Sequence, residues 1–218
     1  MENLFENTFV LTLDTLKEER WNDFEKEIGK IPDIKFEEIQ GVIINGGKTT
    51  EDRDAGCRMG HHKIVSLAKE RNLEYICVFE DDLKIFDHFN NHLDVVRNFI
   101  STHQWEMFYL GGTSWWNTLQ ETDNNQVFKT SRTLCTHAYL IHNSCYDIAM
   151  NACSSYNVAI DTILGDHVHP RGKSYVINPP LVGQRYGYSY IRDGYRKYTI
   201  LEQINGLKEE LNDGQRKN

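Results

Sequence analysis

The sequence YICVFEDD at residues 75–82 decides the fold class of this chain. Its first five residues form an unbroken apolar run, which predicts a strand that is buried on both faces of a sheet. The acids Glu80, Asp81 and Asp82 follow at once. Ligands of open α/β sheets bind beyond the carboxyl ends of the strands. The stretch therefore predicts a central strand with a polar site at its end.

Strand and helix patterns alternate on both sides of this stretch. Further strands are expected at residues 9–13, 40–44, 107–110 and 136–142, and helices after residues 14–15 and at 56–71, 87–100 and 144–153. Residues 118–130 are polar and are expected to form a mobile loop. The alternation predicts an α/β sheet covered by helices. Because no repeat or linker is present, we expect one domain over residues 1–197, then a C-terminal helix and basic tail at 198–218.

Composition excludes several classes of function. The chain has 218 residues and a formal net charge of −8, which argues against nucleic-acid binding because phosphate backbones are held by Lys and Arg clusters. No run of about 18 apolar residues is present, and the first residues carry no basic segment, so neither a membrane span nor a signal peptide is expected. The 5 cysteines show no CxxC spacing, which disfavours disulfides and zinc clusters and indicates a reducing compartment.

The acidic triplet at residues 80–82 needs a compensating charge, because adjacent carboxylates beside a buried strand repel one another. A divalent cation is one solution, since carboxylates are hard oxygen ligands that suit Mg²⁺ or Mn²⁺. If the extended geometry continues, Glu80 and Asp82 share one side and Asp81 takes the other. A cation there could neutralise a diphosphate leaving group. The alternative is a solvated turn without a ligand.

Six blocks in the chain, taken in order, resemble glycosyltransferase family 25, the lipopolysaccharide and collagen sugar transferases with a GT-A fold. The blocks are residues 10–14 with Arg20, residues 56–64, residues 79–83 (the family's version of the DxD motif), residues 136–141, Asp161 with Leu164, and residues 180–191. The resemblance covers roughly residues 9–191. It implies a GT-A-like, Rossmann-like mixed central sheet flanked by helices.

Three positions depart from the family pattern. Thr12 replaces an asparagine, Gly60 replaces a serine, and Tyr190 replaces an aspartate. The last change removes a carboxylate, so the family's roles near residue 190 are not carried over.

The resemblance implies an inverting transferase that moves a hexose, galactose or glucose, from a UDP-sugar to a hydroxyl of a glycan or protein acceptor. It implies Mn²⁺ or Mg²⁺ as cofactor, bound by Glu80 and Asp82, with Asp82 as the more direct ligand. Asp161 is the candidate general base for the acceptor hydroxyl. The alternative for Asp161 is a helix N-cap. A cytoplasmic enzyme of bacterial or viral origin is expected.

The donor-binding candidates are Thr12, Leu13, Asp14, Arg20, Arg53, Arg58, His61, Asp81 and Gln184. The basic residues among positions 53–63 stand near a predicted helix start and could hold phosphate, although a solvated helix face explains them as well. A helix N-cap is the alternative for Asp14.

The resemblance to GT-A enzymes implies a further metal ligand from late in the chain, often a histidine, and the choices are His137, His167 and His169. We keep His167 and His169 as candidates, because an extended segment would place both on one side of the chain. A structural role is the alternative for each. The aromatic residues Trp115, Trp116, Tyr186, Tyr188, Tyr190 and Tyr195 offer surfaces on which a sugar could stack, with core packing as the alternative.

Two rival functions remain at this point. A GT-A-like binding protein without turnover would explain the loss of a carboxylate at Tyr190. A metal-dependent phosphoesterase could use the same carboxylates as the transferase. The oligomeric state is not predicted by the sequence.

Overall fold

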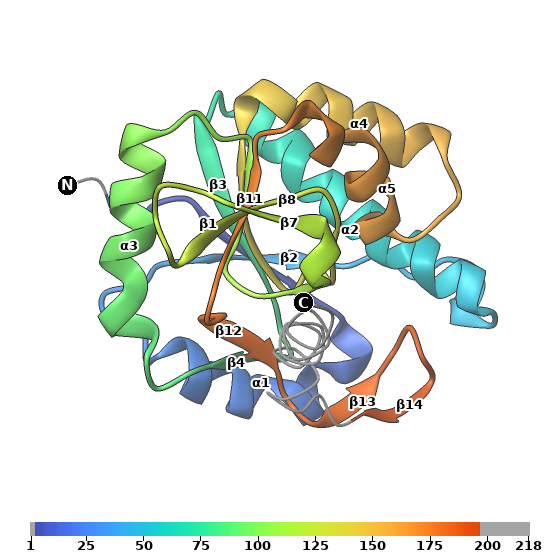
Figure 1. Ribbon diagram of the computed structural model, residues 1–218. Helices are drawn as coiled ribbons and strands as arrows, with labels where there is room; N and C mark the ends of the chain where they lie inside the picture. The colour runs from blue at the N-terminus through green and yellow to red at the C-terminus, as the bar shows by residue number, and fades with distance from the viewer. Residues whose placement is uncertain (1–2, 197–218) are drawn as a thin grey trace, which may run out of the picture.

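The computed structural model describes residues 3–196 of the chain. The C-terminal helix and tail expected at 198–218 lie outside these residues. The described part is a three-layer α/β structure, in which helices cover both faces of a central sheet (Figure 1). The expected α/β architecture is confirmed.

The central sheet has eight strands in the order β2-β1-β3-β10-β5-β11-β8-β7. Their bounds are β1 Thr8–Thr12, β2 Glu37–Gln40, β3 Tyr75–Glu80, β5 Met107–Tyr109, β7 Leu119–Glu121, β8 Val127–Thr130, β10 Ala138–His142 and β11 Ser174–Ile177. Strand β1 pairs in parallel with β2 and β3, and β11 pairs in parallel with β5. Strand β10 runs antiparallel between β3 and β5, so the sheet is mixed, as expected.

Within residues 3–196, five helices and three small sheets surround this core. The helices are α1 Asp14–Ile28, α2 Thr50–Glu70, α3 Phe89–Thr102, α4 Tyr146–Ser155 and α5 Ile160–His167, with short 3₁₀ turns at Asn45–Gly47, Trp116–Thr118, Asn143–Cys145 and His169–Arg171. The paired short strands are β4 Leu83–Ile85 with β12 Val182–Gln184, β6 Thr113–Ser114 with β9 Thr133–Leu134, and β13 Gly187–Ser189 with β14 Gly194–Arg196.

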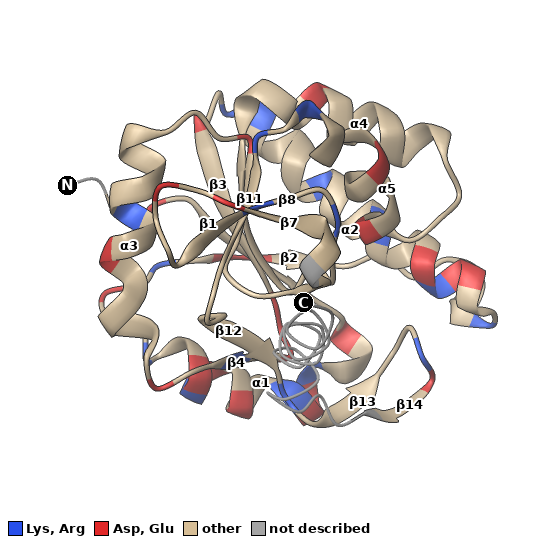
Figure 2. Cartoon of the chain, viewed as in Figure 1, with Lys and Arg blue, Asp and Glu red and all other residues tan. Residues whose placement is uncertain are grey.

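Strand β3 divides two hydrophobic cores, because its side chains alternate between the faces of the sheet. Cys77 and Phe79 belong to the core under α1 and α3, and Ile76 and Val78 belong to the core under α2, α4 and α5. All four side chains are fully buried, so the expected strand with two buried faces is confirmed. Figure 2 shows the charged residues mainly on helices and loops, while the central strands are mostly uncharged.

Helix α2 begins at Thr50, six residues before the expected start at 56. A capping box explains this start. The Thr49 hydroxyl accepts a hydrogen bond from the Asp52 backbone N–H (3.1 Å), and the Asp52 carboxylate accepts one from the Thr49 N–H (3.2 Å). Further along, Gly56 and Gly60 let α2 lie close to its neighbours. A Cβ would stand 2.3 Å from the Val42 carbonyl oxygen at Gly56, and 2.8 Å from the Leu11 side chain at Gly60.

The second strand, expected at 40–44, lies at Glu37–Gln40, so that prediction was wrong by several residues. It is an edge strand in which Ile39 alone is buried, and for this reason no apolar run marks it. Its register is fixed by pairing with β1, where Ile39 stands opposite Leu11.

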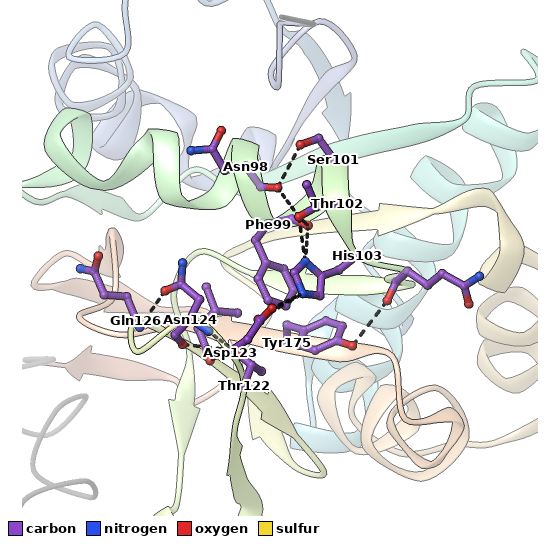
Figure 3. Close-up of polar contacts among 12 residues, drawn as sticks. Asn98, Phe99, Ser101, Thr102, His103, Thr122, Asp123, Asn124, Gln126 and Tyr175 are labelled. Carbon is purple, nitrogen blue, oxygen red and sulfur yellow. Dashed lines mark hydrogen bonds and ion pairs between the residues drawn. The ribbon is translucent and has the colours of Figure 1, made fainter.

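The prediction of a mobile loop at 118–130 was also wrong, because this segment forms strands β7 and β8 of the central sheet. Hydrogen bonds hold its turn, including one from the Gln126 N–H to the Asn124 side chain (2.9 Å). The His103 ring at the end of α3 stacks on Phe99 and contacts the Asp123 carboxylate at 3.2 Å (Figure 3). Pairing with β11, distant in sequence, therefore orders a segment whose own composition is polar.

Candidate functional site

A cavity of about 500 Å³ opens at the carboxyl ends of β1 and β3. The parallel pairing of these strands brings Thr12 and the acidic triplet to one edge of the sheet. Strand β10 is antiparallel to β3, so the residues just before it, including Thr136, reach the same edge. Residues of α2, α5, β12 and the 189–192 segment complete the wall.

The structure brings most of the sequence-predicted site residues to this cavity. Those that line it are Thr12, Leu13, Arg20, Arg53, Glu80, Asp81, Asp82, Asp161 and Gln184. Those that do not line it are Asp14, Arg58, His61, His167 and His169.

The Asp81 carboxylate is bound by two side chains of the same protein, Thr12 and Arg20. Its carboxylate accepts hydrogen bonds from the Thr12 hydroxyl (2.9 Å) and from the Arg20 guanidinium (2.5 Å), and it is 3% exposed. Arg20 also donates to the Tyr188 carbonyl oxygen. Burial lowers the pKa of Arg20, but the neighbouring carboxylates Asp81 and Asp82 outweigh this effect and raise the pKa above its ordinary value. Asp81 therefore joins β1, β3 and α1, rather than standing free for a ligand.

Glu80 points to the other face of the sheet and is held by two side chains. Its Oε1 accepts a hydrogen bond from the Thr136 hydroxyl (2.8 Å) and contacts His61 Nε2 at 3.2 Å. Burial raises the pKa of Glu80, but the hydrogen bond and charge of His61 outweigh it, and the pKa is lowered overall. His61 is 1% exposed, and its Nδ1 contacts the Tyr139 hydroxyl at 2.9 Å. Its place in the structure is behind Glu80, not on the cavity wall where the donor-binding prediction put it.

Asp82 is the carboxylate of the triplet whose hydrogen-bonding capacity is not satisfied. Gln184 Nε2 donates to its Oδ2 at 3.3 Å, whereas its buried Oδ1 has no hydrogen-bond partner among residues 3–196. Burial, and then the charges of Glu80 and Asp81, raise the pKa of Asp82 to about 7. Buried polar atoms are almost always paired, so a carboxylate oxygen without a partner on a cavity wall fits a cation-binding site. The donor set of Glu80 and Asp82 suits the Mn²⁺ or Mg²⁺ that the sequence predicts.

The expected geometry of the triplet holds only in part. Glu80 and Asp81 alternate as residues of a strand do, but β3 ends at Glu80, and a turn follows at residues 81–82. Asp82 therefore returns to the cavity through the turn, and not by continuing the strand.

Helix α2 presents the expected basic residues in different directions. Arg53 lines the cavity and donates to the Gly47 carbonyl (2.9 Å) and the Ile191 carbonyl (3.1 Å), so it ties α2 to the 189–192 segment. Arg58 instead donates to the Val158 carbonyl (3.0 Å) and anchors the connection between α4 and α5. The predicted cluster of phosphate-binding residues is thus reduced to Arg53.

Asp161 faces the cavity and is oriented by two backbone donors. Its Oδ1 accepts from the Thr162 N–H (2.7 Å), and its Oδ2 accepts from the Cys135 N–H (3.3 Å). The N-cap of α5 is Ala159, so the capping alternative for Asp161 is wrong. Capping fails for Asp14 in the same way, because Leu13 is the N-cap of α1 and Asp14 is exposed in the first turn.

His167 and His169 are not brought to the triplet, and the extended segment assumed for them is wrong. His167 ends helix α5, where its ring lies 4.7 Å from that of Tyr156. His169 is 2% exposed, contacts the Tyr109 hydroxyl at 2.9 Å, and has a pKa that burial lowers to about 4. These contacts give both histidines structural roles, and neither is carried into the proposed metal site.

Sequence reasoning missed several residues of the cavity wall, namely Asp54, Cys57, Arg132, Cys135 and Thr136. Asp54 had no separate signal in the sequence, because it is one of several charged residues at the start of α2. Burial raises its pKa, as does the nearby charge of Asp161. No local sequence pattern marks Arg132 as a cavity residue. Its position depends on the start of β9, which directly follows it, and on its ion pair with Asp166 of α5.

A mixed sheet with a charged cavity at its carboxyl edge is typical of α/β enzymes that bind nucleotides. The sequence profile of glycosyltransferase family 25, described as LPS biosynthesis protein, matches residues 44–164, which is more than half of the chain. The chain belongs to glycosyltransferase family 25, and its class of activity is glycosyl transfer. The expected mixed central sheet flanked by helices is confirmed.

No curated protein matches the chain significantly. Similar solved structures include a glycosyltransferase involved in the glycosylation of the major capsid of PBCV-1, with 12% identity, 93% of this chain and 99% of that chain covered, and a TM-score of 0.47. A197 from STIV has 9% identity, coverage of 88% and 95%, and a TM-score of 0.47. The galactosyltransferase LgtC, in complex with donor and acceptor sugar analogues, has 8% identity, coverage of 83% and 87%, and a TM-score of 0.41. Within residues 3–196, no helix has the length and apolar character needed to cross a bilayer.

The raised pKa of Asp82 predicts a pH-dependent stability in metal-free protein. Because the folded-state pKa of about 7 exceeds the ordinary 3.8, unfolding releases a proton between these values, and the free energy of unfolding falls as the pH rises through them. Asparagine does not titrate, so Asp82→Asn should not show this fall in the free energy of unfolding. Above pH 7 the variant should therefore be more stable than the parent by roughly 1 to 4 kcal/mol.

Urea denaturation in the presence of a chelator, from pH 4 to 8, measures this difference. The exposed Asp87→Asn is the matched control and should follow the parent profile. If the free energy of unfolding of Asp82→Asn and of the parent changed with pH in the same way, the raised pKa of Asp82 would be contradicted.

Proposed function

We propose that the protein transfers a hexose, galactose or glucose, from a UDP-sugar to a hydroxyl of a glycan or protein acceptor, with inversion and with a divalent cation. The observation that carries this proposal is the buried, unpartnered Oδ1 of Asp82 in the cavity that Glu80 also lines. The cavity of about 500 Å³ is within the range of small-molecule sites.

The charges on the cavity wall support a role for a cation. The acids on the wall are Asp54, Glu80, Asp81, Asp82 and Asp161, and the bases are Arg20, Arg53, Arg132 and Arg192. Much of the basic charge is already engaged, since Arg20 pairs with Asp81, and Arg132 with Asp166. A diphosphate would therefore meet net repulsion here unless a cation reduced it. Mn²⁺ or Mg²⁺ held by Asp82 and Glu80 would neutralise the charge of the departing UDP.

The end of β1 is where we place the nucleotide. Thr12 is fixed by its hydrogen bond to Asp81, and Leu13 follows it on the cavity wall before α1 begins. Arg53 stands on the same wall, but its guanidinium also holds the 189–192 segment. The segment that closes this side of the cavity is therefore tied to the residue that would face the phosphates.

Asp161 is our candidate for the base. In an inverting transfer, the acceptor oxygen bonds to the anomeric carbon while the bond from that carbon to the UDP oxygen breaks. Asp161 would take the proton of the acceptor hydroxyl. Its two backbone hydrogen bonds fix the carboxylate without neutralising it, and both donors belong to segments that line the cavity.

Exposed aromatic rings, one of them on the cavity wall, supply candidate surfaces for the acceptor. Trp115 lines the cavity and is 39% exposed. Tyr186 and Tyr195 on the β13–β14 hairpin are 65% and 62% exposed, and their rings stack with centroids 6.0 Å apart. Sugar rings bind exposed aromatic faces of this kind, and core packing does not explain side chains so exposed.

Tyr190, which replaces a family aspartate, lies on the cavity wall against Gly47, where a Cβ would meet its hydroxyl at 1.9 Å. It supplies no carboxylate, and the proposed site does not need one there. The two rival functions, a silent binding protein and a phosphoesterase, are outcomes of the experiments below.

Donor binding should require the cation. With Mn²⁺, UDP at about 100 times its dissociation constant should stabilise the protein by roughly 2.7 kcal/mol, which raises Tm by several degrees. Asp82→Ala should abolish this shift, whereas Asp87→Ala, outside the cavity, should retain it. A full shift without metal, or in Asp82→Ala, would overturn the cation assignment.

Turnover should depend on Asp161 separately from binding. Asp161→Asn should lower kcat about 10²- to 10⁴-fold, because a general base is lost, while UDP-sugar binding stays near the parent value. UDP release from UDP-galactose and UDP-glucose, with a panel of simple glycosides, measures the rate. The exposed Asp147→Asn on α4 is the control.

An unchanged rate in Asp161→Asn would refute Asp161 as the base. UDP binding without transfer in the parent would favour the binding protein, and phosphate release without transfer would favour the phosphoesterase.

A further inference from the structure

Three potential metal ligands of different chemistry meet behind the acidic triplet. Cys57, His61 and Glu80 each offer one ligand atom, and these atoms all lie within 4.8 Å of one another. Among residues 3–196, this is the one such group of three or more Cys, His, Asp or Glu side chains. The proposed transfer reaction uses Glu80 but gives Cys57 no role.

We propose that Cys57, His61 and Glu80 form a second cation site, selective for Zn²⁺ or a similarly soft divalent ion, and that an ion bound there withdraws Glu80 from the donor site.

The local fold prepares two of the three ligands. Cys57 and His61 are four residues apart on α2, so their side chains share one face of the helix. The close approach of α2 to Leu11 at Gly60 sets the helix against β1, and His61 contacts Glu80 at the end of β3. Ligands of a tetrahedral zinc ion stand about 3.3 to 3.8 Å apart, given bond lengths of about 2.0 to 2.3 Å. Shifts of about an ångström would therefore close the site.

The hydrogen bonds of His61 allow it to exchange a proton for a metal ion. Its Nε2 contacts Glu80, and its Nδ1 contacts the buried Tyr139 hydroxyl, which can donate or accept. When an ion binds Nε2, the proton of His61 is on Nδ1, and this N–H donates a hydrogen bond to the Tyr139 hydroxyl. A metal-bound histidine usually has such a partner on its other nitrogen, which fixes the orientation of the ring.

The surroundings supply a second partner for Glu80 and a route of entry. Thr136 donates to Glu80 Oε1 at 2.8 Å and would hold the carboxylate on the ion. Cys57 and Glu80 both line the cavity, so an ion reaches them through its mouth. A fourth position on the cavity side would remain for water, as in zinc sites with three protein ligands.

The donor set decides which ion binds. One thiolate and one imidazole favour Zn²⁺ or Co²⁺, whereas the oxygen ligands of Asp82 and Glu80 suit Mg²⁺ or Mn²⁺. Because Glu80 belongs to both sets, the two ions compete for it. Zn²⁺ should therefore weaken Mn²⁺-dependent UDP binding, a consequence that depends on the proposed function, whereas the soft-ion site itself does not.

The test is a Co²⁺ titration of the metal-free, full-length protein without nucleotide, followed by displacement with Zn²⁺. The parent should develop a thiolate-to-cobalt absorption band that Zn²⁺ abolishes. Cys57→Ser should lose the band and bind Zn²⁺ at least about tenfold more weakly, whereas Cys135→Ser, a second thiol on the cavity wall, should behave as the parent.

X-ray absorption of the zinc-loaded parent gives a measurement that needs no variant. It should show one sulfur at about 2.3 Å and lighter ligands at about 2.0 to 2.2 Å. The absence of a sulfur neighbour, or an equal loss of the cobalt band in Cys57→Ser and Cys135→Ser, would overturn the proposal. Either result would leave the Mn²⁺-dependent UDP binding of the donor site intact, so the two proposals fail separately.

Discussion

The ion pair between Arg20 and Asp81 is the interaction on which the rest of the site depends. Three consecutive carboxylates stand at the end of the buried central strand β3, and their mutual repulsion must be offset for β3 to stay in the centre of the sheet. Arg20 reaches from α1 to neutralise Asp81, and it binds the Tyr188 carbonyl with the same guanidinium. The Arg20 side chain thus joins the end of β3 and helix α1 to β13, which leads into the 189–192 segment of the cavity wall. With Asp81 satisfied in this way, and Glu80 held by His61 and Thr136, the uncompensated charge is concentrated on Asp82.

The central part of the fold could be predicted from the sequence because its signals are local. An apolar run of five residues marks β3, and the acids that follow mark its end. Peripheral strands lacked such signals. Strand β2 buries Ile39 alone, and β7 and β8 are ordered by pairing with β11 rather than by their own composition. Pairing between segments distant in sequence leaves no periodic pattern, so a polar hairpin was taken for a loop.

The site shows the same division between local and distant information. The triplet was found because it follows an apolar run with a clear pattern, whereas Thr12 and Asp161 became candidates through the resemblance to the family. The functional face of α2 was not found, because the direction of each side chain depends on how the helix lies against the sheet. Arg53 faces the cavity, Arg58 points to the connection between α4 and α5, and His61 lies behind Glu80. At Gly60, which replaces the family serine, a Cβ would stand 2.8 Å from the end of the Leu11 side chain, so a serine there would require Leu11 to shift.

The central claim is that Asp82 binds a cation together with the diphosphate of the donor. The most direct test is an anomalous diffraction map from crystals of the full chain grown with Mn²⁺ and UDP. The account predicts a manganese peak within bonding distance of the Asp82 carboxylate and of the UDP phosphates. Bound UDP with no manganese at Asp82, or manganese bound elsewhere while Asp82 Oδ1 stays without a partner, would contradict it.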